Sequence, residues 1–187
     1  MSNRVKLSQQ TAILLERARR FGVSEEELLS CAVTGDTTSL QVAEAQYYSY
    51  DEFVSYAHEH NERLEDAIRF GYRIKFSTPG GVQLWLKERF GLEAGVDFTA
   101  SPGLIEQVKL SEGQLQLLNA TIAGNWAFLE GSVVLDREVL LAGDESAAVL
   151  KEASASSEAP GNDAAKSRQL TLVIRSELES YLSSLGA

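Results

Sequence analysis

Three copies of the tripeptide Arg-Phe-Gly limit where helices can continue in this chain. They lie at residues 20–22, 69–71 and 89–91, each after a run of mixed polar and apolar residues and each before an apolar residue. A glycine at such a position adopts the left-handed conformation at little steric cost, and the next apolar residue folds back onto the helix. Because the intervals between the copies differ, we interpret them as helix C-caps and not as a tandem repeat.

Helix start signals complement these stops. Ser24 is followed three residues later by Glu27, which is the spacing of a capping box. Ser8 precedes an apolar stripe at helical spacing. Residues 8–34 therefore predict two consecutive helices joined by a short turn.

The remainder of the first 150 residues mixes both kinds of secondary structure. Residues 50–70 predict one or two helices, and residues 72–142 predict alternating strands and helices, with Ser111–Glu130 as a long helix. Three segments show strand patterns and predict a small antiparallel sheet: residues 72–77, 95–110 and 132–142. The expected fold class is α+β, mainly helical, with residues 1–150 as one globular body.

Composition changes abruptly after this body. Residues 152–168 are rich in Ala, Ser, Glu, Gly and Asp, which predicts a flexible linker. Residues 169–187 then regain an amphipathic pattern and predict a tethered C-terminal helix. A single helix of about 16 residues is marginally stable alone in water, so it must dock on its own core or on another chain. Its predicted contact residues are Ile174, Leu178, Tyr181 and Leu185.

Charge is segregated along the chain. The net charge is −10, but residues 1–23 and 67–91 each carry five basic side chains and one acidic one. Residues 24–66 instead carry eleven acidic side chains and one basic one. Overall acidity argues against general affinity for a phosphate backbone. The two basic segments keep a local nucleic-acid surface as a hypothesis.

Few side chains offer catalytic or metal-binding chemistry. The chain has one cysteine, Cys31, in an apolar context that favours a core position, and two histidines, His58 and His60, two residues apart on a predicted helix. We predict no catalytic residue, no metal site and no cofactor. With 44% hydrophobic and 24% charged residues and no apolar run long enough for a bilayer, we expect a cytoplasmic protein without membrane contact.

One segment could bind an anion. Residues 77–82, Ser-Thr-Pro-Gly-Gly-Val, follow a predicted strand and open a helix that Thr78 and Pro79 begin. The backbone N–H groups of Gly80 and Gly81 would face the anion, and the nearest cations are Arg73, Lys75 and Lys87. An ordinary capped helix start explains the same residues.

A short stretch resembles a known class of domain. The 14 residues "WLKERFGLEAGVDF" are similar to a stretch of phage antirepressor-type domains, in which a helix with Trp and basic residues leads into a Gly–acid–aromatic strand. This resemblance implies a bacterial or phage regulatory protein and identifies no functional residue.

These observations favour a non-enzymatic regulatory protein that binds another macromolecule. A protein partner is expected, and the C-terminal helix could also pair two copies of the chain. The first alternative is a nucleic-acid-binding regulator that uses residues 8–34 as a helix-turn-helix, with Arg17, Arg19 and Arg20 on phosphates, or the basic block 73–89. The second is an acidic mimic of DNA formed by residues 24–66.

Overall fold

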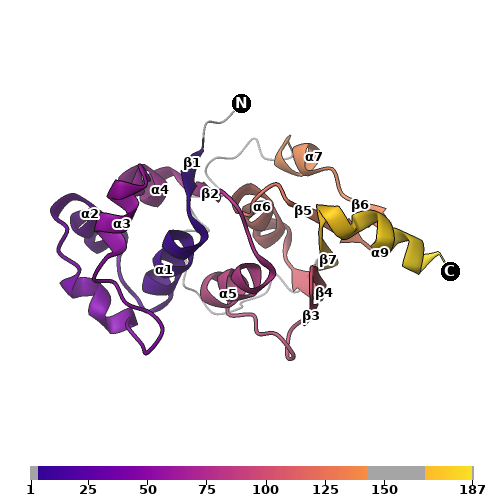
Figure 1. Cartoon of the computed structure of the whole chain (residues 1–187), viewed down its shortest axis with the longest axis horizontal. Coiled ribbons are helices and arrows are strands. Elements are labelled where there is room, and N and C mark those ends of the chain that lie inside the picture. The colour runs from indigo at the N-terminus through magenta and orange to yellow at the C-terminus, as the bar shows by residue number, and fades with distance from the viewer. Residues whose placement is uncertain (1–3, 143–166, 187) are drawn as a thin grey trace. The chain divides into compact units, whose positions relative to one another are not determined.

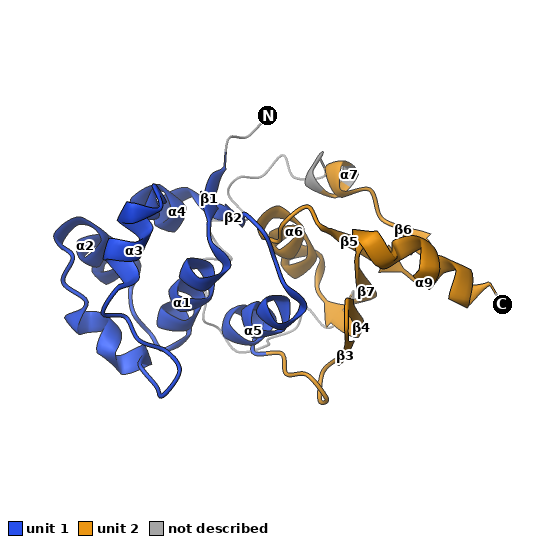
Figure 2. Ribbon diagram, viewed as in Figure 1, with its two compact units in different colours: residues 1–91 blue, residues 92–187 orange. Residues whose placement is uncertain are grey.

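The computed structural model describes residues 4–142 and 167–186 and has the predicted α+β fold (Figure 1). Its chain divides after Gly91 into two compact units, unit 1 (residues 1–91) and unit 2 (residues 92–187) (Figure 2). Within the described ranges, no helix has the length and apolar character needed to span a membrane.

Unit 1 is mainly helical. Its elements are β1 (Val5–Leu7), α1 (Gln9–Arg20), α2 (Glu25–Thr34), the 3-10 helix η1 (Thr38–Ala43), α3 (Phe53–Glu59), α4 (Leu64–Phe70), β2 (Tyr72–Ile74) and α5 (Pro79–Phe90). The helices predicted over residues 8–34 and 50–70 are thus present, two in each segment.

Helix α1 lies at the centre of unit 1 and packs most extensively against α5. All eight residues from Thr11 to Ala18 are buried, including the charged Glu16 and Arg17. Helix α2 begins with the predicted capping box, in which Ser24 Oγ accepts from Glu27 N–H and the Glu27 carboxylate accepts from Ser24 N–H at 2.8 Å. The buried carboxylate and guanidinium of α1 need partners inside the unit.

The three Arg-Phe-Gly stops are not equivalent. After α1, Gly22 has φ +88°, and Val23 N–H donates to Ala18 O at 3.1 Å, which is the long hydrogen bond of a Schellman cap. Gly91 also ends α5 in the left-handed conformation. Gly71 combines φ 78° with ψ 173° and leads directly into β2, so it is an extended exit and not a left-handed cap.

Strand β2 pairs with a strand that the sequence analysis did not anticipate. It runs parallel to β1 in a separate two-stranded sheet, with Val5 opposite Tyr72 and Leu7 opposite Ile74. The prediction that residues 72–77 join one antiparallel sheet with residues 95–110 and 132–142 is therefore wrong. Three residues of β1 are too short for a recognisable period-two pattern.

Unit 2 is built around a five-stranded antiparallel sheet of order β3-β4-β7-β5-β6. Its elements are β3 (Thr99–Ser101), β4 (Leu104–Leu110), α6 (Glu112–Thr121), β5 (Trp126–Glu130), β6 (Val133–Val134), α7 (Arg137–Ala142), β7 (Arg168–Ile174), the 3-10 helix η3 (Arg175–Glu177) and α9 (Leu178–Leu185). The hairpin predicted within residues 95–110 is present as β3 and β4.

Two predicted boundaries in unit 2 are corrected. The long helix predicted over Ser111–Glu130 ends at Thr121, and residues 126–130 form β5. Of residues 132–142, only β6 is a strand, and α7 occupies residues 137–142. All of Trp126–Leu129 is buried, so β5 lacks the alternation that distinguishes a strand from a helix.

The C-terminal segment is both strand and helix. The predicted helix exists as α9, but it begins at Leu178 and not at residue 169, because β7 occupies the centre of the sheet between β4 and β5. Of the predicted linker, residues 152–166 lie outside the described residues, and Arg168 is the first residue of β7. A central strand with two neighbours is a fixed part of unit 2.

Candidate functional site

The predicted partner-binding residues of the C-terminal segment mostly contact their own unit. Leu178 and Tyr181 pack with Leu182 on a buried cluster of the sheet formed by Ala127, Leu129 and Val173. The Tyr181 hydroxyl donates to Glu106 Oε1 at 3.3 Å. Ile174 belongs to β7, where it pairs with Trp126, and Leu185 remains 48% exposed. The helix thus docks within its own chain.

The start of α5 is occupied by a side chain of α1. The Gln9 carboxamide oxygen accepts from Thr78 N–H at 2.7 Å and from the Thr78 hydroxyl at 3.2 Å. The same carboxamide lies so close to Gly81 that a Cβ there would overlap it. Gly81 therefore serves this packing, and the predicted anion contact of Gly80 and Gly81 stays a prediction. Lys87 lies in the last turn of α5, at the opposite end of the helix.

The arginines that a helix-turn-helix would need are held inside unit 1. The Arg17 Nε donates to Ala43 O at 2.7 Å, and its Nη1 pairs with Glu88 Oε1 at 3.2 Å. Arg20 Nε lies 2.9 Å from Glu88 Oε2. The Arg17 guanidinium also lies over the ring of Tyr48, 4.0 Å from its centroid. Because Arg17 and Arg20 are paired with Glu88, their charges are already neutralised within unit 1 and are not available to a phosphate.

A second buried carboxylate neutralises two more arginines. Glu16 accepts from Arg19 at 2.9 Å, from Arg89 at 3.0 Å and from the Tyr72 hydroxyl at 2.7 Å. The Tyr72 oxygen in turn accepts from Trp85 Nε1 at 2.9 Å. Burial alone would raise the pKa of Glu16, but the two guanidinium groups and the hydroxyl lower it below its ordinary value. Glu16 is therefore ionised in the folded protein at neutral pH.

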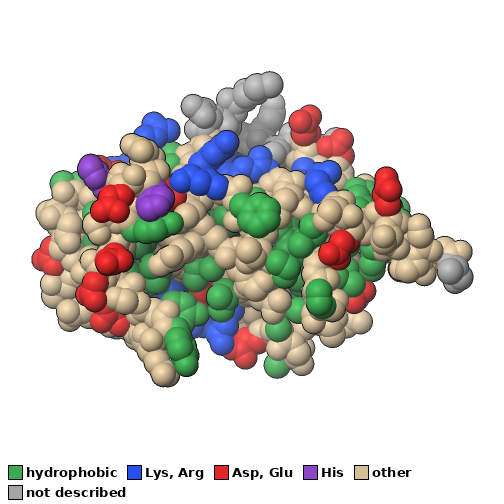
Figure 3. All heavy atoms as spheres, in the orientation of Figure 1, with side chains coloured by type: hydrophobic (Ala, Val, Ile, Leu, Met, Phe, Trp, Pro, Cys, Tyr) green, Lys and Arg blue, Asp and Glu red, His purple; other side chains and the backbone are tan. Residues whose placement is uncertain are grey.

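Three cations of the same two basic segments lie along β1, β2 and the residue after β2; Lys6 and Lys75 are exposed and Arg73 is half-buried. The parallel register sets Lys6 directly opposite Arg73, on the face of β1 and β2 that points away from buried Val5, Leu7, Tyr72 and Ile74. Lys75 follows Arg73 by two residues and is exposed. We call Lys6, Arg73 and Lys75 the cationic face. Lys and Arg side chains gather over β1 and β2 in Figure 3.

The cationic face has one partly satisfied counter-ion. Lys75 Nζ lies 2.7 Å from Glu62 Oε1, which also accepts from Ser8 N–H at 2.6 Å. Among the described residues, neither Lys6 nor Arg73 forms a salt bridge, and the buried Arg73 Nε has no hydrogen-bond partner. Like charges directly opposite each other on paired strands destabilise the pair. Lys6 is exposed and Arg73 is half-buried, and an anion bound at their accessible atoms would reduce the repulsion between them.

Sequence reasoning identified Arg73 and Lys75 but missed Lys6. The structure brings Lys6 to them and leaves the other predicted anion contacts, Gly80, Gly81 and Lys87, at α5. The only available signal was the alternation in Val5-Lys6-Leu7, whose partner strand lies more than 60 residues away in the chain.

The acidic segment is largely unpaired with the basic ones. Nine of the eleven acidic side chains in residues 24–66 are exposed, on α2, α3, α4 and the connections between helices. Glu62 pairs with Lys75, and Asp66 pairs with Arg63 of its own helix start at 3.1 Å. Unit 1 thus carries separate acidic and basic surfaces. The hypothesis of a DNA mimic remains a prediction.

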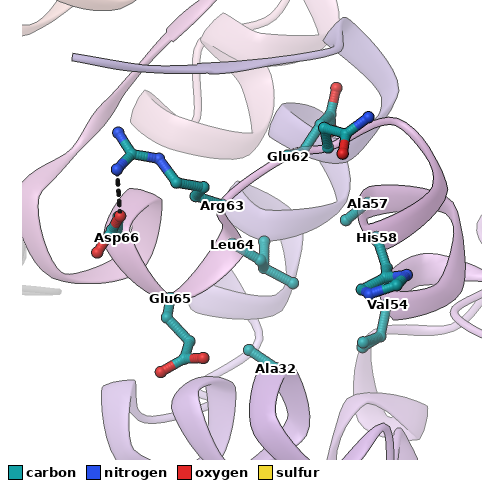
Figure 4. Close-up of a pocket in the computed structure, with 10 residues that line it drawn as sticks. Ala32, Val54, Ala57, His58, Glu62, Arg63, Leu64, Glu65 and Asp66 are labelled. Carbon is teal, nitrogen blue, oxygen red and sulfur yellow. Dashed lines mark ion pairs between the residues drawn. The ribbon is translucent and has the colours of Figure 1, made fainter. Parts of the chain in front are cut away.

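A groove of about 660 Å³ lies between α2, α3 and α4 within this acidic region. Ala32, Val54, Ala57 and Leu64 supply its apolar lining, and polar groups including His58 and Glu65 complete it. Figure 4 shows Arg63 directed toward Asp66 at the α4 side. Within residues 4–142 and 167–186, no group of three or more His, Cys, Asp and Glu could hold a metal ion.

The remaining buried reactive groups have structural roles. Burial, aided by nearby Asp36, raises the pKa of the Cys31 thiol to about 11, so the thiol is protonated at neutral pH and not nucleophilic. In unit 2, Arg137 donates to carbonyl oxygens at the end of α6, including Ile122 O at 2.7 Å and Asn119 O at 2.6 Å. This guanidinium therefore complements the negative end of the α6 dipole.

No family model matches the chain, and neither a curated protein nor a solved structure shows significant similarity to it. The geometry of the described residues is therefore the basis for a functional proposal.

Proposed function

We propose that the protein is a non-enzymatic regulatory protein that binds nucleic acid, with its cationic face on the phosphate groups. The register that sets Lys6 opposite Arg73 carries this proposal. A fold that neutralises Arg17, Arg19 and Arg89 on buried carboxylates leaves these two cations adjacent and without an acidic partner among the described residues. A phosphate between them would supply the missing negative charge and accept from the guanidinium.

The net charge of the whole chain limits the length of nucleic acid that the protein can contact. A net charge of −10 opposes a long contact with a polyanion. The exposed carboxylates of α2, α3 and α4 would repel any strand that continued across unit 1. We therefore infer a short contact that spans the cationic face, with an affinity that falls steeply as salt rises.

The hypothesis of a protein partner rested mainly on the apolar stripe of the C-terminal helix. Leu178 and Tyr181 are engaged with the sheet of unit 2, so most of the apolar stripe that favoured a partner helix is already covered. Arg17, Arg19 and Arg20 are likewise engaged within unit 1. The nucleic-acid hypothesis therefore moves from α1 and α2 to β1 and β2.

Fluorescence anisotropy with a labelled oligonucleotide tests the proposal. The double variant Lys6→Gln/Arg73→Gln should weaken binding at low salt by at least about tenfold, because a hydrogen bond to a charged group contributes about 1.5–3 kcal/mol. Lys109→Gln is the matched control, since Lys109 is an exposed cation on β4 of unit 2. Equal affinities of the double variant and the wild type would contradict the proposal.

A further inference from the structure

Two exposed aromatic side chains lie close in the chain to the cationic face. Phe70 is the last residue of α4 and is 74% exposed, and Phe76 follows Lys75 and is 61% exposed. Arg73 and Lys75 lie between them in the chain. Figure 3 shows hydrophobic side chains at the surface beside the cations over β1 and β2.

Exposure of these two rings is not explained by packing within unit 1. The other aromatic residues of β2 and α5 are engaged: Tyr72 and Trp85 are buried and hydrogen-bonded to each other, and Phe90 packs edge-to-face on Trp85. An exposed phenylalanine gives up the stabilisation that burial of its ring would provide. Phe70 and Phe76 each lie three residues from Arg73 in the chain, and we call them, together with the cationic face, the aromatic-cationic surface.

We propose that this surface recognises single-stranded nucleic acid, with Phe70 and Phe76 stacking on unpaired bases while Lys6 and Arg73 contact the backbone. This inference rests on the proposed function and names the class of nucleic acid. Unpaired bases present their flat faces to aromatic side chains, whereas a duplex hides them in its stack. On a duplex, Phe70 and Phe76 would find no unpaired base on which to stack.

The distribution of charge favours a strand over an anionic membrane, which cations and phenylalanines can also bind. Unit 1 also carries nine exposed carboxylates in residues 24–66, whose charge opposes a broad anionic membrane more than a narrow strand. A single strand is narrow and can contact the cationic face alone. The acidic charge of unit 1 thus favours a single strand over an anionic membrane.

The test compares three labelled probes by anisotropy: a single-stranded oligonucleotide, the corresponding duplex, and an abasic strand that keeps the sugar-phosphate backbone. DNA and RNA versions of the first probe show whether the sugar matters. The wild type should bind the single strand more tightly than the other two. Phe70→Ala and Phe76→Ala should each weaken binding to the single strand roughly tenfold and leave binding to the abasic strand unchanged.

Tyr47→Ala is the matched control, because Tyr47 is 85% exposed within the acidic segment of the same unit. Its affinity for every probe should equal that of the wild type. Both phenylalanines are exposed, so their replacement should leave thermal unfolding unchanged, which a melting curve verifies for each variant.

The outcomes separate this inference from the proposed function. Equal binding of all three probes, sensitive to Lys6 and Arg73 but not to the phenylalanines, would overturn the stacking role and leave the phosphate contact intact. No binding of any nucleic acid would overturn both. Binding only to vesicles of phosphatidylserine and phosphatidylcholine, lost in Phe70→Ala and Phe76→Ala, would show that this face contacts a membrane instead.

Discussion

The two basic segments of unit 1 have the same net charge, but each contributes cations to two different environments. On α1 and α5, arginines from both segments are neutralised by Glu16 and Glu88, which are the only acidic residues of residues 1–23 and 67–91. On β1 and β2, Lys6 and Arg73 come from the same segments and are left adjacent at the surface. The net charge of a segment therefore does not indicate which of its cations are available to a ligand.

The largest effect should follow from removing a buried counter-ion. Glu16→Gln removes the buried carboxylate that pairs with both Arg19 and Arg89. Breaking a buried ion pair by removing one partner costs about 3–5 kcal/mol. Urea unfolding should show this loss, whereas Glu65→Gln, at an exposed position, should change the free energy of unfolding by less than about 0.5 kcal/mol.

The same network predicts a dependence of stability on pH. The pKa of Glu16 is lowered in the folded protein, so its contribution is complete above the ordinary value of 4.5 and is lost as pH falls through the folded pKa. The difference in free energy of unfolding between wild type and Glu16→Gln should therefore shrink on acidification. A difference that stayed constant through the carboxylate range would show that Glu16 is not the ionised centre of the network.

Substitution of two adjacent glycines at the start of α5 should change stability less, and in opposite directions at the two positions. Gly81→Ala should displace the Gln9 carboxamide from Thr78 and cost about 1 kcal/mol, the net contribution of a typical hydrogen bond. A Cβ on Gly80 meets no atom within 4 Å, so Gly80→Ala should stabilise the protein by about 0.4–1 kcal/mol. Thermal unfolding of both variants checks this. Equal effects would mean that Gln9 does not occupy the start of α5.

The smallest expected effect concerns Lys6 and Arg73, the pair of cations without an acidic partner among the described residues. Lys6→Glu turns a like-charged pair with Arg73 into an opposite-charged one and should stabilise unit 1 by about 0.2–1 kcal/mol. The same variant should bind nucleic acid more weakly. A loss of stability in Lys6→Glu would indicate that Lys6 has a structural partner and is not held for a ligand.

Local signals in the sequence predicted the helices of unit 1 well. Ser24 and Glu27 cap α2, and Gly22 ends α1 in the left-handed conformation, because these features depend only on residues a few positions apart. Gly71 shows the limit of such signals, since its entry into β2 gives the same tripeptide a different backbone conformation.

Pairings between distant residues could not be read in this way. Trp126 and Leu129 continue the helical spacing of α6, yet they belong to β5 because β7, about 45 residues later, pairs with them. Covered on both faces, β5 shows no alternation. The candidate site has the same origin: Lys6 is placed beside Arg73 by a parallel register that no local pattern specifies.

The salt dependence of single-strand binding is the most direct test of the claim that the cationic face contacts phosphates. For single strands, log K falls with log salt concentration with a slope of about −0.7 per neutralised phosphate. Two contacts, from Lys6 and Arg73, predict a slope of about −1.4 for the wild type, and Lys6→Gln/Arg73→Gln should reduce it toward zero. An unchanged slope in the double variant, with binding retained, would contradict the account.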